Sequence, residues 1–111
     1  MSAKGRGKVM NIKYRLLEIL KQCDEDRPLD RDDFAKSYDI SERVVRTYIN
    51  ELRKEGHRIC SSSDKYGYWM AKDDLGYLRF RREYMSRAIK IIDTVRAMDG
   101  SLDGQIGGLE N

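Results

Sequence analysis

The amino-acid sequence predicts a mainly α-helical protein with one small β-hairpin. Three observations support this fold class. Apolar residues recur at helical spacing between residues 11 and 55. After Gly56 the period drops from 3.6 to 2 on both sides of a polar loop, which is typical of a hairpin. From Asp74 the helical spacing returns and continues without proline to Gly100. The chain of 111 residues has room for one domain.

Three helices are predicted before Gly56, and each has recognisable end signals. They cover residues 11–22, 31–37 and 42–55. Asn11, Asp30 and Ser41 are favoured N-cap residues for the three helices. Pro28 prevents the first helix from continuing, so the segment before Asp30 is expected to be a loop. Gly56 ends the third helix in a left-handed conformation.

The hairpin is predicted from two short apolar runs around a polar loop. Its strands are residues 58–60 and 68–71, and its loop is 61–67. Successive side chains of a strand point to opposite faces. Tyr68 and Met70 are expected to face the core, so Trp69 is expected to face outward, under the C-terminal helix or at an interface.

The third helix has two contrasting faces. At about 100° per residue, one buried stripe is predicted. Its members are Val45, Tyr48, Ile49 and Leu52. The opposite face carries Arg43, Thr47, Asn50 and Lys54, flanked by Arg46. Arg can pair with guanine, Asn with adenine, and a Thr methyl can contact thymine, so this face suits the major groove of DNA. The same pattern also occurs on the solvated face of a structural helix.

The short helix, the turn at Tyr38–Ile40 and the longer helix form a helix-turn-helix. Further motif positions are Ser41, the pair Leu52-Arg53, Gly56, the pair Gly67-Tyr68 and Met70. In these positions residues 9–72 resemble the winged helix-turn-helix at the N-terminus of the biotin repressor and of many WYL-type and DeoR-type bacterial regulators. The complete fold class that we expect is therefore a winged helix-turn-helix plus a long C-terminal helix.

The resemblance implies roles for individual residues. Arg43, Arg46, Thr47 and Asn50 would contact the major groove of double-stranded DNA, and the loop from Ser61 to Lys65 would meet the backbone. The DNA-binding residues that we expect are Ser41, Arg43, Arg46, Thr47, Asn50, Lys54, Ser62 and Lys65. The sensor domains of those regulators have no counterpart, so no small-molecule effector is expected.

The C-terminal helix is predicted over residues 74–99, capped by Asp73 or Asp74. It carries two apolar rows. One row is Leu75, Leu78, Met85, Ile89 and Ile92, and the other is Phe80, Tyr84, Ala88, Ile91, Val95 and Met98. One row is expected to meet the preceding domain and the other a second copy, with Leu78, Met85, Ile89 and Ile92 at a homodimer interface. Alternatively, the whole helix folds back onto its own domain.

Charge is unevenly distributed along the chain. Net charge is +5 over residues 1–22, −4 over 23–39, +3 over 40–72 and −1 over 73–111, which sums to the overall +3. Such asymmetry can mark a polyanion-binding face. The acidic second helix favours a different function, a winged-helix protein–protein adaptor. The exposed Arg43, Thr47 and Asn50 argue for DNA, because an adaptor does not need them together.

The sequence divides into four segments. These are a basic arm (1–9), the winged helix-turn-helix domain (10–72), the long helix (73–99) and a tail expected to be disordered (100–111). The arm could enter a minor groove or be a disordered, solubilising end. No apolar run approaches the about 18 residues of a membrane helix. Because no secretory signal or disulfide framework is evident, we expect a cytoplasmic protein.

No catalytic chemistry is predicted. One histidine and scattered carboxylates provide no triad or acid–base pair, so the chain is not expected to be an enzyme. Cys23, His57 and Cys60 have poor spacing for zinc, and neither a metal nor another cofactor is expected. The expected function is that of a small dimeric transcriptional regulator, or of a DNA-binding protein of a mobile element.

Overall fold

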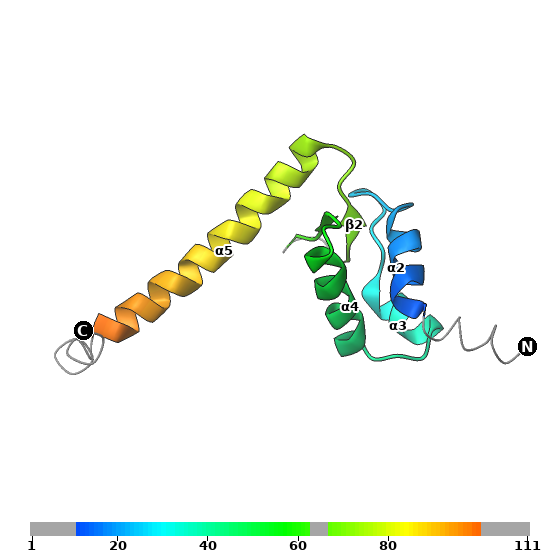
Figure 1. The fold of residues 1–111 in the computed structure, drawn as a ribbon, viewed down its shortest axis with the longest axis horizontal. Coiled ribbons are helices and arrows are strands. Elements are labelled where there is room, and N and C mark those ends of the chain that lie inside the picture. Colours follow the sequence, from blue (N-terminus) through cyan, green and yellow to red (C-terminus); the bar gives the residue numbers. More distant parts are fainter. Residues whose placement is uncertain (1–10, 63–66, 101–111) are drawn as a thin grey trace, which may run out of the picture. The chain divides into compact units, whose positions relative to one another are not determined.

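The computed structural model describes residues 11–62 and 67–100 and confirms the predicted fold class (Figure 1). The elements are α2 (Ile12–Leu20), α3 (Arg31–Ser37), α4 (Glu42–Lys54), β1 (Ile59–Cys60), β2 (Trp69–Met70) and α5 (Asp74–Gly100). The predicted arm, Lys65 and nearly all of the predicted tail lie outside the described residues. By its internal contacts the chain separates into one unit up to Phe80 and a second from Arg81 onward.

The first unit is built on one apolar cluster beneath α4. Helix α4 packs against both α2 and α3 (Figure 1). The helical members of the cluster are Leu16, Leu17, Leu20, Phe34, Ala35, Val45, Ile49 and Leu52. Fully burying a side chain of leucine size stabilises the fold by about 1.5–3 kcal/mol. The predicted stripe of α4 is confirmed, since Val45, Ile49 and Leu52 are buried and Tyr48 packs against the cluster.

Side-chain caps fix where α3 and α4 begin. The Asp30 carboxylate accepts hydrogen bonds from the N–H groups of Asp32 and Asp33, and Ser41 Oγ accepts one from the N–H of Val44 at 3.1 Å. Both predicted caps are confirmed. Asn11 occupies the N-cap position of α2, but its side chain makes no capping hydrogen bond. Helix α2 ends at Leu20, two residues before the predicted end.

The ends of α3 and α4 use the same backbone motif with different residues. After α3, Asp39 adopts φ 54° and the Ile40 N–H donates to the Ala35 carbonyl at 2.9 Å. After α4, Gly56 adopts φ 102° and the His57 N–H donates to the Leu52 carbonyl at 3.1 Å. A residue in the left-handed region followed by this six-to-one bond is the Schellman motif. The predicted conformation of Gly56 is confirmed.

The predicted hairpin is confirmed, with shorter strands than expected. Ile59 pairs with Met70, and Cys60 pairs with Trp69, in antiparallel register. The expectation that the segment before Asp30 is only a loop is wrong at one residue. Leu29 forms an antiparallel bridge with Tyr68, and its N–H donates to the Tyr68 carbonyl at 2.7 Å. This bridge gives the hairpin a third backbone partner at the edge of the core.

Trp69 lies on the face of the hairpin that the sequence predicts, but it is not open to solvent. Trp69 lies opposite Cys60, on the other face of the hairpin from Tyr68 and Met70, so the predicted alternation holds. However, Trp69 is only 8% exposed and Cys60 only 1%. Arg58 joins the hairpin to the start of α5. The Arg58 guanidinium contacts Asp74 at 2.7 Å and lies 4.3 Å from the centre of the Tyr77 ring.

Helix α5 begins at the predicted place and ends at Gly100 instead of residue 99. The Asp73 carboxylate accepts a hydrogen bond from the Gly76 N–H at 2.8 Å, which settles the predicted choice of cap in favour of Asp73. In the second unit every residue from Arg81 to Gly100 is exposed. Among the described residues, no helix has the length and apolar character required to cross a membrane.

Candidate nucleic-acid interface

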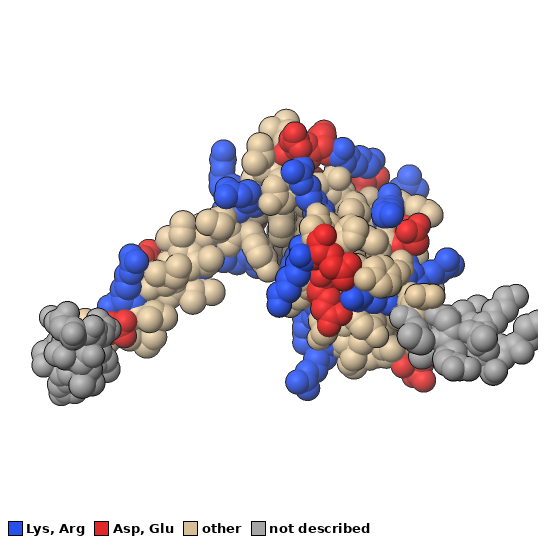
Figure 2. Space-filling view, viewed as in Figure 1, with Lys and Arg blue, Asp and Glu red and all other residues tan. Residues whose placement is uncertain are grey.

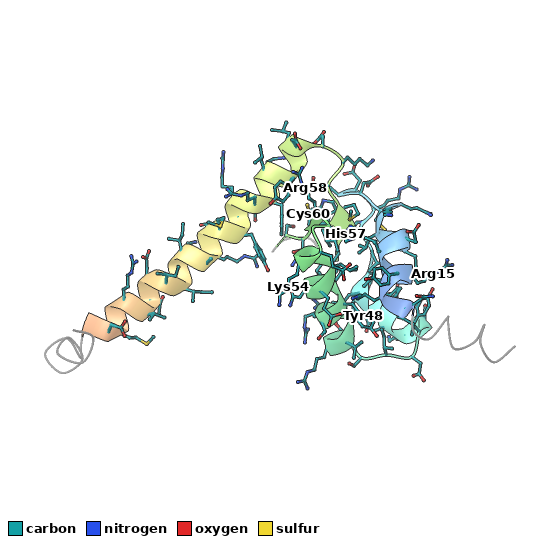
Figure 3. All side chains as sticks on the ribbon, viewed as in Figure 1. Arg15, Tyr48, Lys54, His57, Arg58 and Cys60 are labelled. Atoms are coloured by element: carbon teal, nitrogen blue, oxygen red, sulfur yellow. The ribbon has the colours of Figure 1, made fainter. Side chains whose placement is uncertain are left out.

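The candidate interface is the face of α4 opposite its buried stripe. Arg43, Arg46, Thr47, Asn50 and Lys54 are all exposed. Figure 3 shows Tyr48 on the side of α4 that faces α2 and α3, and Lys54 on the side turned away from them. The structure therefore brings the five predicted groove-facing residues of α4 onto one surface, which we call the α4 outer face.

The polar groups of the α4 outer face remain available to a ligand. Within the described part of the chain, the side chains of Arg43, Arg46, Asn50 and Lys54 have no hydrogen bond, ion pair or ring contact. Thr47 Oγ1 donates to the Arg43 carbonyl at 3.1 Å, and Thr47 as a whole is exposed. Side chains that satisfy no structural role can exchange their water for phosphate or base edges.

In contrast, the acidic residues of α4 and its C-cap are paired with the other helices. Glu42 accepts from Arg31 of α3 at 2.7 Å. Glu51 and Glu55 contact Lys13 of α2 at 3.3 and 3.1 Å. The hydrogen bonds from Lys13 and Tyr14 hold the pKa of the Glu55 carboxyl below its usual value, and the Lys13 pKa is correspondingly raised. Pairing on one side leaves a net positive charge on the other.

Figure 2 shows how charged side chains are distributed over one face of the molecule. In Figure 2 acidic side chains form a patch over α4, and basic side chains gather along the edge beside it and at the lower tip of the first unit. Glu51 and Glu55 are paired with Lys13, whereas Arg43, Arg46 and Lys54 are exposed. A local excess of positive charge attracts the phosphate backbone whatever its sequence.

The acidic loop before α3 is also engaged by basic residues. Asp24 accepts from the N–H groups of Asp26 and Arg27 and from Lys72 Nζ at 3.2 Å. The hydrogen bond from Arg27, followed by that from Lys72, lowers the pKa of Asp24 below its usual value. Glu25 lies 3.8 Å from Arg79. In Figure 1 this loop lies at the upper end of the first unit and the start of α4 at the lower end.

Three other predicted DNA-binding residues lie at the ends of α4 or in the hairpin loop. Ser41 is exposed, and its hydroxyl caps α4. Ser62 is half-buried after β1. Lys65 is outside the described residues.

Arg53 belongs to the motif pair Leu52-Arg53, but the sequence did not reveal its positioning role. Its Nε donates to the Ile59 carbonyl at 2.9 Å and its Nη2 to Ser61 Oγ at 3.4 Å. Its guanidinium also lies 5.8 Å from the Tyr68 ring centre and 5.1 Å from that of Phe80. Arg53 thus positions the hairpin relative to α4. Its place between the buried and exposed faces of α4 is the sequence signal that distinguishes it from Arg43 and Lys54.

The comparison with protein families agrees with this geometry. Residues 15–69 match a family described as "HTH domain", that is, a helix-turn-helix domain. This segment is a winged helix-turn-helix domain. Such domains bind DNA and are typically non-enzymatic, so the winged domain is assigned to DNA binding. The comparisons with curated proteins and with solved structures gave no match.

The remaining candidates for chemistry do not form a site in the described part of the protein. No three His, Cys, Asp or Glu side chains there are grouped so that they could hold a metal ion. Cys23 and Cys60 are free thiols, and burial raises the pKa of each. Thiols with a raised pKa form little of the reactive thiolate at neutral pH.

The four residues predicted for a dimer interface are exposed in the single chain. Leu78 lies in the first unit and is 53% exposed, and Met85, Ile89 and Ile92 lie in the second at 45% to 51%. Large apolar side chains with this exposure are candidates for contact with a partner.

Proposed function

We propose that the winged domain binds double-stranded DNA sequence-specifically, with α4 in the major groove, as part of a small dimeric transcriptional regulator or a DNA-binding protein of a mobile element. The observation that carries this proposal is the charge division of α4. Its acids are paired with α2 and α3, whereas Arg43, Arg46 and Lys54 of the α4 outer face have no partner within the described residues.

The proposed contacts follow from the chemistry of each side chain. Arg43 and Arg46 can each donate two hydrogen bonds to guanine, and Asn50 can pair with adenine. The methyl group of Thr47, an exposed residue, can contact the thymine methyl group. Lys54, Ser41 and the loop residues Ser62 and Lys65 would bind phosphates, which fixes the position of α4 without reading the sequence.

A dimer would double this interface. Leu78, Met85, Ile89 and Ile92 would cover one another across a two-fold axis. Two copies of α4 would then address half-sites about 34 Å apart, so the preferred site is an inverted repeat. The arginine and asparagine contacts belong to each winged domain separately and do not require the dimer.

Substitutions on the α4 outer face test the proposal. Arg46→Ala and Asn50→Ala should each weaken binding to a selected duplex by about 1–3 kcal/mol per lost base contact. Arg27→Ala, an exposed arginine of the acidic loop, is the matched control and should change affinity little. Fluorescence anisotropy with the selected duplex and with a scrambled duplex measures both affinity and specificity. If both α4 variants keep full affinity and specificity, α4 does not read the DNA.

The alternative is a protein–protein adaptor, which the acidic α3 favours. Asp33 of α3 is exposed, but Asp32 is paired with Lys36 and Asp30 caps the helix. The adaptor function would be supported if the wild-type protein fails to bind any duplex at low salt.

A further inference from the structure

The second unit carries an apolar surface much wider than one predicted row. Between Tyr84 and Val95, at about 100° per residue, seven apolar side chains cover about 160° of the helix circumference. They are Tyr84, Met85, Ala88, Ile89, Ile91, Ile92 and Val95, all exposed. The other side carries Glu83, Ser86, Arg87, Lys90, Asp93 and Thr94. Arg87 lies 5.4 Å from the centre of the Tyr84 ring and marks one edge of the apolar surface.

A seven-residue repeat runs along the middle of this surface. Its members are Arg81, Met85, Ala88, Ile92, Val95 and Asp99, with alternating steps of four and three residues. This is the spacing of the core positions of a coiled coil. The repeat is apolar in its middle and ends in opposite charges.

Charge is also divided along the helix. Residues 81–90 carry four basic and one acidic side chain, and residues 91–100 carry one basic and two acidic. The first half therefore has net charge +3 and the second −1. A parallel pair of such helices would place the two positive halves together, whereas an antiparallel pair places each positive half beside a negative one.

We propose that α5 pairs with α5 of a second copy in antiparallel orientation, with the two-fold axis near Lys90. In this register, positions whose numbers add to 180 face one another. Arg81 then meets Asp99 of the second copy, Met85 meets Val95, and Ala88 meets Ile92. Each layer of the proposed core joins either two opposite charges or a larger and a smaller apolar side chain. One contact is unfavourable, because Arg82 and Arg96 come together at the solvated edge.

The proposal rests on the dimer of the proposed function and adds its direction and register. It keeps Met85, Ile89 and Ile92 in the interface, whereas Leu78 lies beyond the paired segment. It also predicts the distance between the two points at which the winged domains join the paired helices. At 1.5 Å per residue, an antiparallel pair centred near Lys90 separates the two copies of Phe80 by about 30 Å along the helix axes. The winged domains are joined to α5 at these two points, and one helical turn of DNA is about 34 Å long. In a parallel pair the two points would lie side by side, about 10 Å apart.

Charge reversal in the full-length protein tests the direction. In the antiparallel pair, Arg81→Asp places two acids together and Asp99→Arg two bases, so each variant should weaken self-association about tenfold. The double variant restores opposite charges and should return to within about twofold of the wild-type Kd. In a parallel pair position 81 meets itself in every variant, so the single variants would associate like the wild type. Sedimentation equilibrium without DNA measures all four proteins.

The outcomes separate the proposals. Loss in both single variants with recovery in the double variant supports antiparallel pairing. Single variants equal to the wild type, or a double variant as weak as the single ones, overturn it while leaving the dimer intact. A wild-type protein that is monomeric at tens of micromolar overturns both the pairing and the dimer, but not DNA reading by α4, which the Arg46 and Asn50 variants test.

A disulfide provides a second readout of the register. Ala88→Cys mixed with Ile92→Cys should give a mixed disulfide dimer in mild oxidant, because antiparallel layers join these positions. In a parallel pair, Ala88→Cys would cross-link to itself instead, and that result would overturn the proposal. Wild-type protein, which keeps Cys23 and the buried Cys60, is the control for cross-linking by the native thiols.

Discussion

Helix α4 and the part of α5 beyond Phe80 use their apolar residues in opposite ways. In α4, Val45, Ile49 and Leu52 are buried by the same chain. In α5 from Arg81 onward, no residue is buried, and Ile91 remains 66% exposed. Helix α4 is capped by Ser41 at its start and by the Gly56 motif at its end.

The two helices obtain their stability from different contacts. Packing of an apolar face supplies most of the stability of a protein helix. Contacts within one chain provide this packing for α4, so its outer face is free to bind DNA. The second unit has the apolar face but lacks contacts within the described chain that bury it. Substitutions in the first unit should therefore change folding, whereas substitutions in the second unit should change self-association.

The largest expected effect concerns the second unit. Replacing Ile89 and Ile92 with Asp should weaken self-association at least about a hundredfold, because the dimer would bury unpaired charges. Affinity for an inverted repeat should fall in parallel. The winged domain should remain folded, because both side chains are exposed in the single chain. Sedimentation velocity measures self-association, and circular dichroism measures folding. If the variant also loses helicity and the cooperative unfolding of the winged domain, the two units do not act separately.

A glycine in the first unit should have the next largest effect, this time on folding. Gly67 has φ 125°, and a Cβ there would collide with the backbone carbonyl of Leu29. Gly67→Ala should therefore lower the free energy of unfolding by about 2–4 kcal/mol. Gly56→Ala is the matched control, because φ is also positive but no atom lies within 4 Å of the new Cβ. Its cost should be about 1–2 kcal/mol. Urea titration of both variants at one protein concentration provides the comparison, and equal costs would contradict it.

The two helix ends predict a smaller, favourable change. Asp39 has φ 54°, a conformation that costs most L-residues about 1–2 kcal/mol and costs Gly almost nothing. Gly has more freedom in the unfolded chain, which removes about 0.5–1 kcal/mol of this gain. Asp39→Gly should therefore raise the free energy of unfolding by about 0.5 kcal/mol. Asp39→Ala, which keeps the strained φ, is the control, and thermal unfolding of both variants and the wild type measures the cost of this conformation. A lower melting temperature for the Gly variant than for the wild type would refute the prediction.

The smallest effect is a pH dependence of the contact between α2 and α4. The folded pKa of Glu55 lies below its usual 4.5, first because of Lys13 and then because of Tyr14. The contact therefore stabilises the fold above about pH 4.5 and is lost as pH falls through the lowered pKa. Lys13→Met should be less stable than wild type at pH 7, and the difference should shrink at pH 3. Urea midpoints at the two pH values measure it, and an equal difference at both would argue against a charge contribution.

The sequence was sufficient to predict the parts of the fold that local signals determine. Asp30, Ser41 and Gly56 mark the ends of α3 and α4, and the spacing of Val45, Ile49 and Leu52 identifies the buried face of α4. Because the opposite face of a helix follows from the buried one, the exposure of Arg46 and Asn50 was also predictable. Their contacts with DNA remain predictions.

The features that the sequence did not reveal depend on contacts between distant residues. Leu29 stands alone between Pro28 and Asp30, and nothing in this local pattern indicates that it pairs with Tyr68. Arg53 differs from Lys54 only because its position on α4 brings it to the hairpin. The alternation around Trp69 predicted its face correctly, but it left open whether the C-terminal helix or an interface covers that face.

The burial of Trp69 has an optical consequence. Trp69 is the chain's one tryptophan, and it is 8% exposed opposite Cys60. The intrinsic indole fluorescence of the protein therefore comes from a single apolar environment on the hairpin. Neither α4 nor the second unit contains an indole. Emission that shifts to longer wavelength reports solvent reaching the hairpin, without interference from signals of the surfaces proposed for DNA and for the second copy.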